Sequence, residues 1–180
     1  MSDPPVIAGT HVRLRPLRIE DAPALHELYS DAGAMTWWTH GPHDRLEETE
    51  AKLANNLSRD DWRAWAITLA DDDRAIGTAA AHEERQGRVA EIGYSLSRAH
   101  WGSGLAREAV GLLIGFLFEV EGYRRIFADT DPDNAPSNGL LTRLGFTLEG
   151  RLRSAWETHI GVRDSLIWGL LATEWSQVEH

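Results

Sequence analysis

Hydrophobic and polar residues alternate over residues 11–15, a pattern typical of a strand with one buried face. A helical pattern begins at Asp21, whose side chain suits a helix N-terminus, and it carries apolar residues at helical spacing as far as position 29. Asp44 and Glu47 resemble a capping box, which predicts a second helix running to about Ser58. The chain therefore begins with one strand and two helices.

Three strand-like segments follow, separated by turn residues at 71–73 and 86–87, which predicts an antiparallel meander. A glycine-rich turn then leads into a long helix that is apolar around most of its circumference and should be largely covered. The full order, β-α-α-β-β-β-α-β-α-β-β, predicts a mixed α/β sheet that is mostly antiparallel, with one parallel β-α-β crossover. The predicted bounds are strands over 62–69, 74–82 and 88–97, a helix over 104–120, a strand over 124–130, a helix over 136–144, and strands over 147–155 and 165–171.

Composition narrows the class of protein. The 180 residues suit one domain over 1–180, and the absence of cysteine excludes disulfides and thiolate catalysis. A formal net charge of −10 would repel nucleic acid, which argues against such a partner. The first residues lack the pattern of a secretory signal, and no apolar stretch is long enough to span a bilayer. We therefore expect a soluble, cytoplasmic protein with no membrane partner.

The strand that contains Glu91 runs into the glycine-rich turn, and the turn opens the long helix. The first backbone N–H groups of a helix have no acceptor within it, and the helix dipole places partial positive charge there. Gly102 and Gly104 let the backbone curl and a phosphate approach, and Arg107 adds a positive charge. The turn is therefore a candidate anion site, with a tight turn that binds nothing as the alternative. The glycine patterns of P-loops and dinucleotide-binding folds are absent from the sequence.

A second motif follows one strand later, from Asp131 to Phe146, and contains Asp-Pro-Asp-Asn-Ala-Pro-Ser-Asn and then Leu-Gly-Phe. Taken with Glu-Ile-Gly-Tyr over 91–94 and Trp-Gly-Ser-Gly-Leu-Ala over 101–106, it resembles the GNAT superfamily of N-acetyltransferases. Within that superfamily it is similar to the Rim-type branch of ribosomal-protein N-terminal acetyltransferases. The resemblance covers residues 90–150 closely. It implies a GNAT-type fold, an α+β mixed sheet flanked by helices.

The resemblance also implies how acetyl-CoA binds. The pantetheine arm is expected to pair with the backbone of the splayed strand from Tyr94 to Ser97, which includes Leu96. Asn134 lies where the family's asparagine hydrogen-bonds the arm, and Asn138 is expected to support that contact. The pyrophosphate is expected on the glycine turn, formed by Trp101, Gly102, Ser103, Gly104, Leu105, Ala106 and Arg107.

Transfer to an amine needs a base, because alkyl amines are almost wholly protonated at pH 7 and only the neutral form attacks a thioester. Glu91 is the best candidate, and the Rim-type branch has glutamate at this position. Many superfamily members protonate the departing thiolate with a tyrosine, but Leu141 stands there in this chain. The branch places serine at Ser137, so we expect Ser137 to serve as the acid in a direct transfer. An ordinary strand carboxylate and an ordinary helix-start serine are the alternatives.

Several assignments stay open. The tryptophans could line an acceptor pocket or pack in the core, and two aspartates could contact a cationic acceptor or form turns. These tryptophans and aspartates are Trp37, Trp38, Trp62, Trp65, Asp129 and Asp131. No histidine has the spacing of a metal site, so no metal is expected.

Two functions remain in competition. The first is an acetyl-CoA-dependent N-acetyltransferase acting on a peptide N-terminus or a small amine. The second is a non-catalytic acyl-CoA-binding module that keeps the glycine turn but has no turnover. Analogy with the family makes a homodimer the expected assembly.

Overall fold

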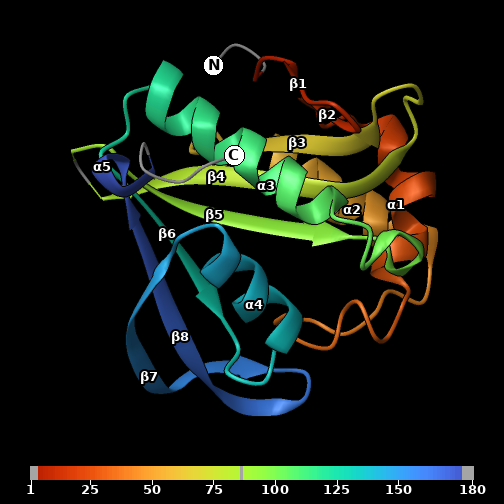
Figure 1. Cartoon of the computed structure of the whole chain (residues 1–180). Coiled ribbons are helices and arrows are strands. Elements are labelled where there is room, and N and C mark those ends of the chain that lie inside the picture. The colour runs from red at the N-terminus through yellow and green to blue at the C-terminus, as the bar shows by residue number, and fades with distance from the viewer. Residues whose placement is uncertain (1–3, 86, 176–180) are drawn as a thin grey trace.

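The computed structural model describes residues 4–85 and 87–175. Their strands form one eight-stranded sheet in the order β1-β2-β3-β4-β5-β6-β8-β7, shown in Figure 1. The strands are β1 (Ile7–Ala8), β2 (Val12–Pro16), β3 (Trp62–Leu69), β4 (Ala75–Arg85), β5 (Val89–Leu96), β6 (Arg125–Thr130), β7 (Thr147–Thr158) and β8 (Gly161–Leu171).

Helices cover both faces of the sheet. Helix α3 crosses one face, α1 and α2 lie against the other, and α4 lies beside β6 and β8 (Figure 1). The helices are α1 (Ala22–Tyr29), α2 (Leu46–Leu57), α3 (Leu105–Gly115), α4 (Ala135–Arg143) and α5 (Ala172–Trp175), with 3₁₀ turns at Ile19–Asp21 and Arg98–His100. None of the helices in the described residues is long and apolar enough to cross a membrane.

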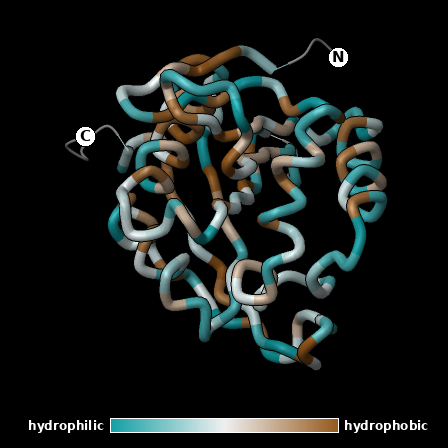
Figure 2. The backbone as a smooth tube through the Cα atoms, turned by 90° about the vertical axis from the view of Figure 1, so that its right-hand side faces the viewer, coloured by the Kyte–Doolittle hydropathy of each residue, from teal (hydrophilic) through white to brown (hydrophobic). Residues whose placement is uncertain are grey.

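Two apolar clusters, one on each face, hold the layers together. Leu113 and Ile114 of α3 pack on one face of the sheet, and Leu25 and Leu28 of α1 pack with Leu53 of α2 on the other. Figure 2 shows the side of α1 and α2, where hydrophobic and hydrophilic residues alternate along the same segments. Such alternation is what helices with one buried face require.

The strand pairing confirms the predicted mixed sheet. Neighbouring strands are antiparallel except β5 and β6, which the crossover through α3 makes parallel. Their pairing covers only three residues of each strand and ends at Glu91 and Phe127. Beyond this point β5 continues to Leu96 against β4 alone, and the two strands point apart in Figure 1. Alternate backbone groups of β5 therefore face β6 without a strand partner.

Local details differ from the sequence prediction, which has no counterpart of β1 or α5. Helix α2 has Arg45 at its N-cap, and the carboxylate that closes the box is Glu48, not Glu47. Glu48 Oε2 accepts hydrogen bonds from the backbone N–H groups of Asp44 (2.7 Å) and Arg45 (3.0 Å). The long helix changes to π geometry over Phe116–Val120, which apolar spacing does not distinguish from α geometry. Part of the turn predicted at 86–87 lies outside the described residues.

Candidate active site

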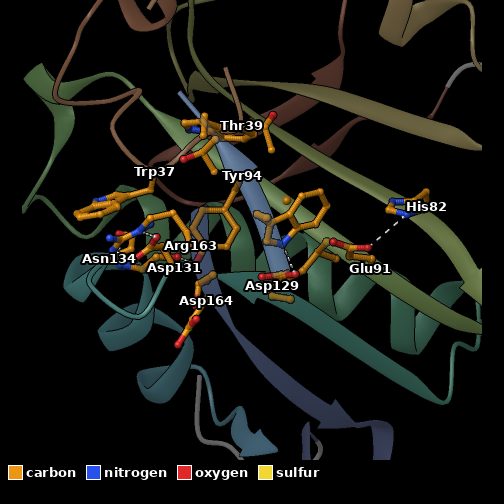
Figure 3. A pocket seen from close by; sticks show the side chains of 18 of the residues that line it. Trp37, Thr39, His82, Glu91, Tyr94, Asp129, Asp131, Asn134, Arg163 and Asp164 are labelled. Atoms are coloured by element: carbon orange, nitrogen blue, oxygen red, sulfur yellow. Dashed lines mark hydrogen bonds and ion pairs between the residues drawn. The ribbon is translucent and has the colours of Figure 1, made fainter. Parts of the chain in front are cut away.

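A pocket of about 250 Å³ opens where β5 and β6 diverge. We call it the central pocket. Its walls come from six strands, from α4 and from the loop over residues 37–39 (Figure 3). The side chains that matter below are Trp37, Trp38, Trp62, His82, Glu91, Tyr94, Asp129, Asn134, Ser137, Trp156 and Arg163.

Glu91 stands at the point where the strands part. Its side chain is 29 % exposed and faces the pocket. Burial, with the nearby charges of Asp129 and Glu84, raises the pKa of Glu91 to about 7. A carboxyl group with that pKa exchanges protons near neutral pH, which is the property a general base needs.

Ser137 and Tyr94 meet across the pocket. Their hydroxyl oxygens are 2.7 Å apart, so either group can donate to the other. Burial raises the pKa of Tyr94 to about 12, with the hydrogen bond to Ser137 acting in the opposite direction. Tyrosine in this state keeps its proton at neutral pH. The expectation for Tyr94 concerned only its backbone, and the structure adds its hydroxyl group to the pocket.

The two asparagines of the second motif have different surroundings. Asn134 lines the pocket and caps α4, where its Oδ1 accepts a hydrogen bond from the Ser137 backbone N–H at 3.3 Å. Asn138 accepts from the Thr130 hydroxyl at 2.6 Å and donates to the backbone carbonyl of Asp131 at 3.2 Å. Asn138 thus fastens the β6–α4 loop, and it does not line the central pocket.

The glycine turn has the shape of an anion site. Gly102 (φ +73°) and Gly104 (φ +85°) adopt the left-handed conformation that favours glycine, and Gly104 caps the N-terminus of α3. No atom lies within 4 Å of where a Cβ would stand at either glycine, so the approach to the turn is open. Trp101 folds back and donates from Nε1 to the Leu96 carbonyl at 2.7 Å, which ties the turn to the end of β5.

A second, larger cavity of about 900 Å³ starts at this turn and follows α3. We call it the α3 groove. Ser103, Gly104, Leu105 and Arg107 line its beginning, and Arg143 from the end of α4 also faces it. Ala106 is half-buried and packs against the core beside the groove. The two arginines give this end of the groove positive charge.

The central pocket has an aromatic and acidic wall opposite α4. Asp129 Oδ2 accepts a hydrogen bond from Trp156 Nε1 at 3.0 Å. Trp156 follows an irregularity in β7, between Leu152 and Trp156, where Ser154 has a positive φ of 51°. Bulges of this kind re-aim side chains near functional sites. The irregularity therefore accounts for the way Trp156 reaches from an edge strand into the pocket.

Arg163 occupies the other end of this wall. It donates two hydrogen bonds to the Asp131 carboxylate, at 2.7 and 2.9 Å, and its guanidinium lies 5.6 Å from the centre of the Trp37 ring. The pairing holds the pKa of Asp131 below its usual value. Of the two aspartates considered from sequence, Asp131 is thus neutralised within the protein, whereas Asp129 receives only neutral donors.

The loop over residues 37–39 is held from two sides. Lys52 Nζ, on α2, lies 2.9 Å from His40 Nε2 and 5.8 Å from the centre of the Trp38 ring. Burial lowers the pKa of Lys52. From the β7–β8 turn, His159 Nδ1 forms a hydrogen bond with the Trp38 carbonyl at 3.0 Å. These contacts fix the position of the loop that forms part of the pocket wall.

The tryptophans divide between the two roles left open by the sequence. Trp37, Trp38 and Trp62 line the central pocket, but Trp65 is fully buried in the core and donates from Nε1 to the Pro5 carbonyl at 2.9 Å. Trp62 and Trp65 differ by an odd number of positions along β3, so their side chains leave opposite faces of the sheet.

The sequence analysis did not assign His82, Trp156 or Arg163 to a pocket that they line. His82 lies directly opposite Glu91 in the β4–β5 ladder, and a two-residue turn at 86–87 is enough to predict that pairing. Trp156 carried no such signal, because it depends on the irregularity in β7. His82, Glu84 and Glu91 also form the one group among the described residues whose ligand atoms, all within 4.8 Å of one another, could hold a metal ion.

A sheet that splays beside a glycine turn, with a carboxylate and a hydroxyl pair in the opening, has the features expected of the class of group-transfer enzymes. Comparison with known proteins agrees with this class. The acetyltransferase (GNAT) domain family matches residues 11–147. The chain therefore belongs to the GNAT acetyltransferase family, and it is an acyltransferase.

Relatives and solved structures cover nearly the whole chain. An uncharacterized N-acetyltransferase, p20 of Bacillus licheniformis, is 33 % identical, and the match covers 91 % of this chain and 94 % of p20. Spermidine N(1)-acetyltransferase of Escherichia coli is 26 % identical over 78 % of this chain and 75 % of its own.

Among solved structures, a probable GNAT-family acetyltransferase from Chromobacterium violaceum superimposes with a TM-score of 0.88 at 31 % identity, covering 97 % of this chain and 91 % of that chain. RimJ of Mycobacterium smegmatis, solved in complex with CoA-disulfide, superimposes with a TM-score of 0.81 at 25 % identity, covering 94 % of this chain and 85 % of its own.

Proposed function

We propose that this protein transfers the acetyl group of acetyl-CoA to a primary amine by direct attack in a ternary complex, with Glu91 as the base. The observation that carries the proposal is the placement of Glu91 and the Ser137–Tyr94 hydroxyl pair around one pocket, at the divergence of β5 and β6. A base and an acid must both reach the reacting atoms, and this pocket offers both groups.

The cofactor would lie across the divergence. Its pyrophosphate would bind the free N–H groups at the start of α3, next to Gly102 and Gly104, with Arg107 adding charge. Its pantetheine arm would pair with the unpartnered backbone of β5 from Tyr94 to Leu96. The complex of the relative RimJ with CoA-disulfide supports this use of the fold.

The chemistry then follows from the groups present. Glu91 takes a proton from the bound ammonium, and the neutral amine attacks the thioester carbonyl. A backbone N–H of the splayed strand stabilises the oxyanion. A C–N bond forms and the C–S bond breaks. The departing thiolate takes a proton from Ser137, whose hydroxyl is hydrogen-bonded to that of Tyr94. The second proton of the amine nitrogen leaves as the amide forms and restores the Ser137–Tyr94 pair, so the net products are the amide, the CoA thiol and protonated Glu91.

The acceptor is an amine carried on a small group. A space of about 250 Å³ holds roughly the end of a chain molecule and not a folded domain, since drug-sized ligands need at least about 300 Å³. Aromatic walls and the Asp129 carboxylate favour a cation there. A peptide N-terminus, as in the Rim-type branch, and the end of a polyamine, as in the spermidine-acetylating relative, both have this chemistry.

The proposal is tested by mixing the purified protein with acetyl-CoA and a panel of polyamines and short peptides, and measuring free CoA thiol. We expect thiol release that depends on the added amine and stops when the peptide N-terminus is blocked. Tight CoA binding without amine-dependent release from any acceptor would instead identify a binding module.

A further inference from the structure

His82 lies outside both sequence motifs but touches the proposed base. It stands on β4 opposite Glu91, and its Nε2 is 3.4 Å from Glu91 Oε2 and 3.2 Å from Glu84 Oε2 (Figure 3 shows the first of these contacts). The three side chains differ in exposure: Glu91 is 29 % exposed, His82 14 % and Glu84 49 %. The imidazole therefore connects a carboxylate of the pocket with a carboxylate at the protein surface.

The orientation of the His82 ring is fixed by its neighbours. It stacks on Trp62 with ring centres 4.9 Å apart and an interplanar angle of 26°. The guanidinium of Arg59 lies 4.9 Å from the centre of the same Trp62 ring, on which His82 is stacked. Trp62 also lines the pocket, so the stack forms part of the wall and keeps Nε2 close to both carboxylates.

Base catalysis leaves a proton on Glu91 after each transfer. The bound acyl group and amine would fill the small pocket on the side of Glu91 that faces the substrate. While the products still occupy the pocket, the proton needs another way to water. Imidazole is the side chain that both accepts and releases a proton near neutral pH.

We propose that His82 relays the proton from Glu91 to Glu84, and from there to solvent. The inference rests on the proposed function. In the first step the O–H bond of Glu91 breaks and an N–H bond forms at His82 Nε2. In the second step that N–H bond breaks and the proton passes to the Glu84 carboxylate, which releases it to water or buffer. His82 touches no substrate in this scheme, so it is a relay residue and not a catalytic one.

The charges around His82 suit a transient imidazolium. Glu84 faces it from β4 and Glu91 from β5, while Asp129 on β6 acts through Glu91. Asp61, just before β3, lies close enough to His82 for the two side chains to interact electrostatically. Arg59, beyond the Trp62 ring, is the cation on this side. Carboxylates therefore face the imidazole from several elements, which favours passage of a positive charge.

The decisive experiment separates the first turnover from later ones in His82→Gln. Glu91 is ready to accept a proton at the start, so a single turnover with enzyme in excess of acetyl-CoA should keep its wild-type rate. Steady-state kcat should fall on the order of tenfold, with kcat/KM for the amine unchanged and KM lowered in proportion, because only the regeneration of the base after chemistry is slowed. Added imidazole or a higher buffer concentration should restore kcat.

Two further variants complete the test. Glu84→Gln leaves the buried part of the relay intact, so it should lower kcat by a smaller factor that buffer also restores. It provides a second test should His82→Gln fold poorly. His26→Gln, on α1 and away from both cavities, is the matched control and should leave kcat unchanged.

Several outcomes would overturn the relay. The relay is wrong if His82→Gln and Glu84→Gln both keep the wild-type steady-state kcat. It is also wrong if the single-turnover rate of His82→Gln falls as much as its kcat, or if no buffer restores the kcat. Loss of wild-type activity on treatment with a chelator would assign the three side chains to a metal ion instead. The proposed function fails separately, if the wild-type protein itself shows no amine-dependent release of CoA.

Discussion

Strand β5 joins two regions that are built to bind in different ways. At its C-terminal end, the turn around Gly102 and Gly104 offers backbone N–H groups and an open approach. Near its N-terminal end, around Glu91, the pocket is made of side chains from six strands, a helix and a loop. The first region depends on backbone conformation, and the second depends on which side chains the register brings together.

This difference decides what each region can recognise. Backbone groups bind a diphosphate through features that acyl-CoA molecules share, so the turn suits a constant donor. The pocket side chains, Trp156 and Asp129 among them, can change without disturbing the turn. A fold with one fixed and one variable region can keep its donor while the acceptor changes. Four predictions test this division.

The largest effect is expected for Glu91→Gln. Loss of the base should lower kcat/KM by roughly 10²–10⁴. Because the pKa of Glu91 is about 7, wild-type activity should rise with pH through that value. The fold deficit should be greatest at and below pH 7 and shrink as the pH nears the pKa of the amine itself. Rates of CoA release across pH 5–10 measure this, with the exposed Glu157→Gln as control. A variant with the wild-type profile would remove Glu91 from the mechanism.

The next effect is expected at the other end of β5. Gly104→Val places a β-branched residue at φ +85°, which costs about 1–2 kcal/mol and disturbs the N–H groups of the turn. The Kd for CoA should rise by at least about tenfold, as measured by calorimetry. Gly150→Val, where the space for a Cβ is also open and φ is not positive, is the matched control. Similar CoA affinities in the two variants would contradict the assignment of the turn.

Glu91 should also affect stability. Its folded-state pKa of about 7 lies above the ordinary 4.5, so the folded state binds more protons than the unfolded state between these values. Stability is then lost as pH rises through this window, and the loss is complete above about 7. Glu91→Gln should raise the free energy of unfolding at pH 8 by about 3 kcal/mol and leave it unchanged at pH 4. Urea unfolding at both pH values measures this; an equal shift at both would point to packing instead.

The smallest effects are expected for two tryptophans, one in each region, and they compare the turn with the pocket most directly. Trp101 and Trp156 are both about half exposed, and each donates one Nε1 hydrogen bond, to Leu96 and to Asp129 respectively. Removing such a bond with phenylalanine costs about 1 kcal/mol, roughly fivefold in binding. Trp101→Phe should raise KM for acetyl-CoA alone, and Trp156→Phe should raise KM for the amine alone. Steady-state kinetics with each substrate varied in turn would detect a crossed effect, which would contradict the division.

The same division explains what sequence could predict. The glycine turn and the second motif are local, so their spacing was sufficient to predict the turn, the start of α4 and the chain order of the sheet. The pocket wall depends on long-range register. His82 meets Glu91 through a hairpin, and Trp156 reaches Asp129 only because β7 is irregular before it. Strand parity puts Trp62 and Trp65 on opposite faces but does not tell which of them lies in the core, because helices cover both faces of the sheet. The homodimer and the cytoplasmic location stay predictions.

Lys52, which holds the loop over residues 37–39 in place, is the chain's one lysine. An enzyme that carries an activated thioester can modify its own ε-amino groups, and this one presents a single such group, half-buried and in contact with an imidazole. Peptide maps of the enzyme after a reaction should therefore show almost no acetyllysine. Acetyl groups that leave the donor can then be counted on the acceptor with very little background from lysine side chains.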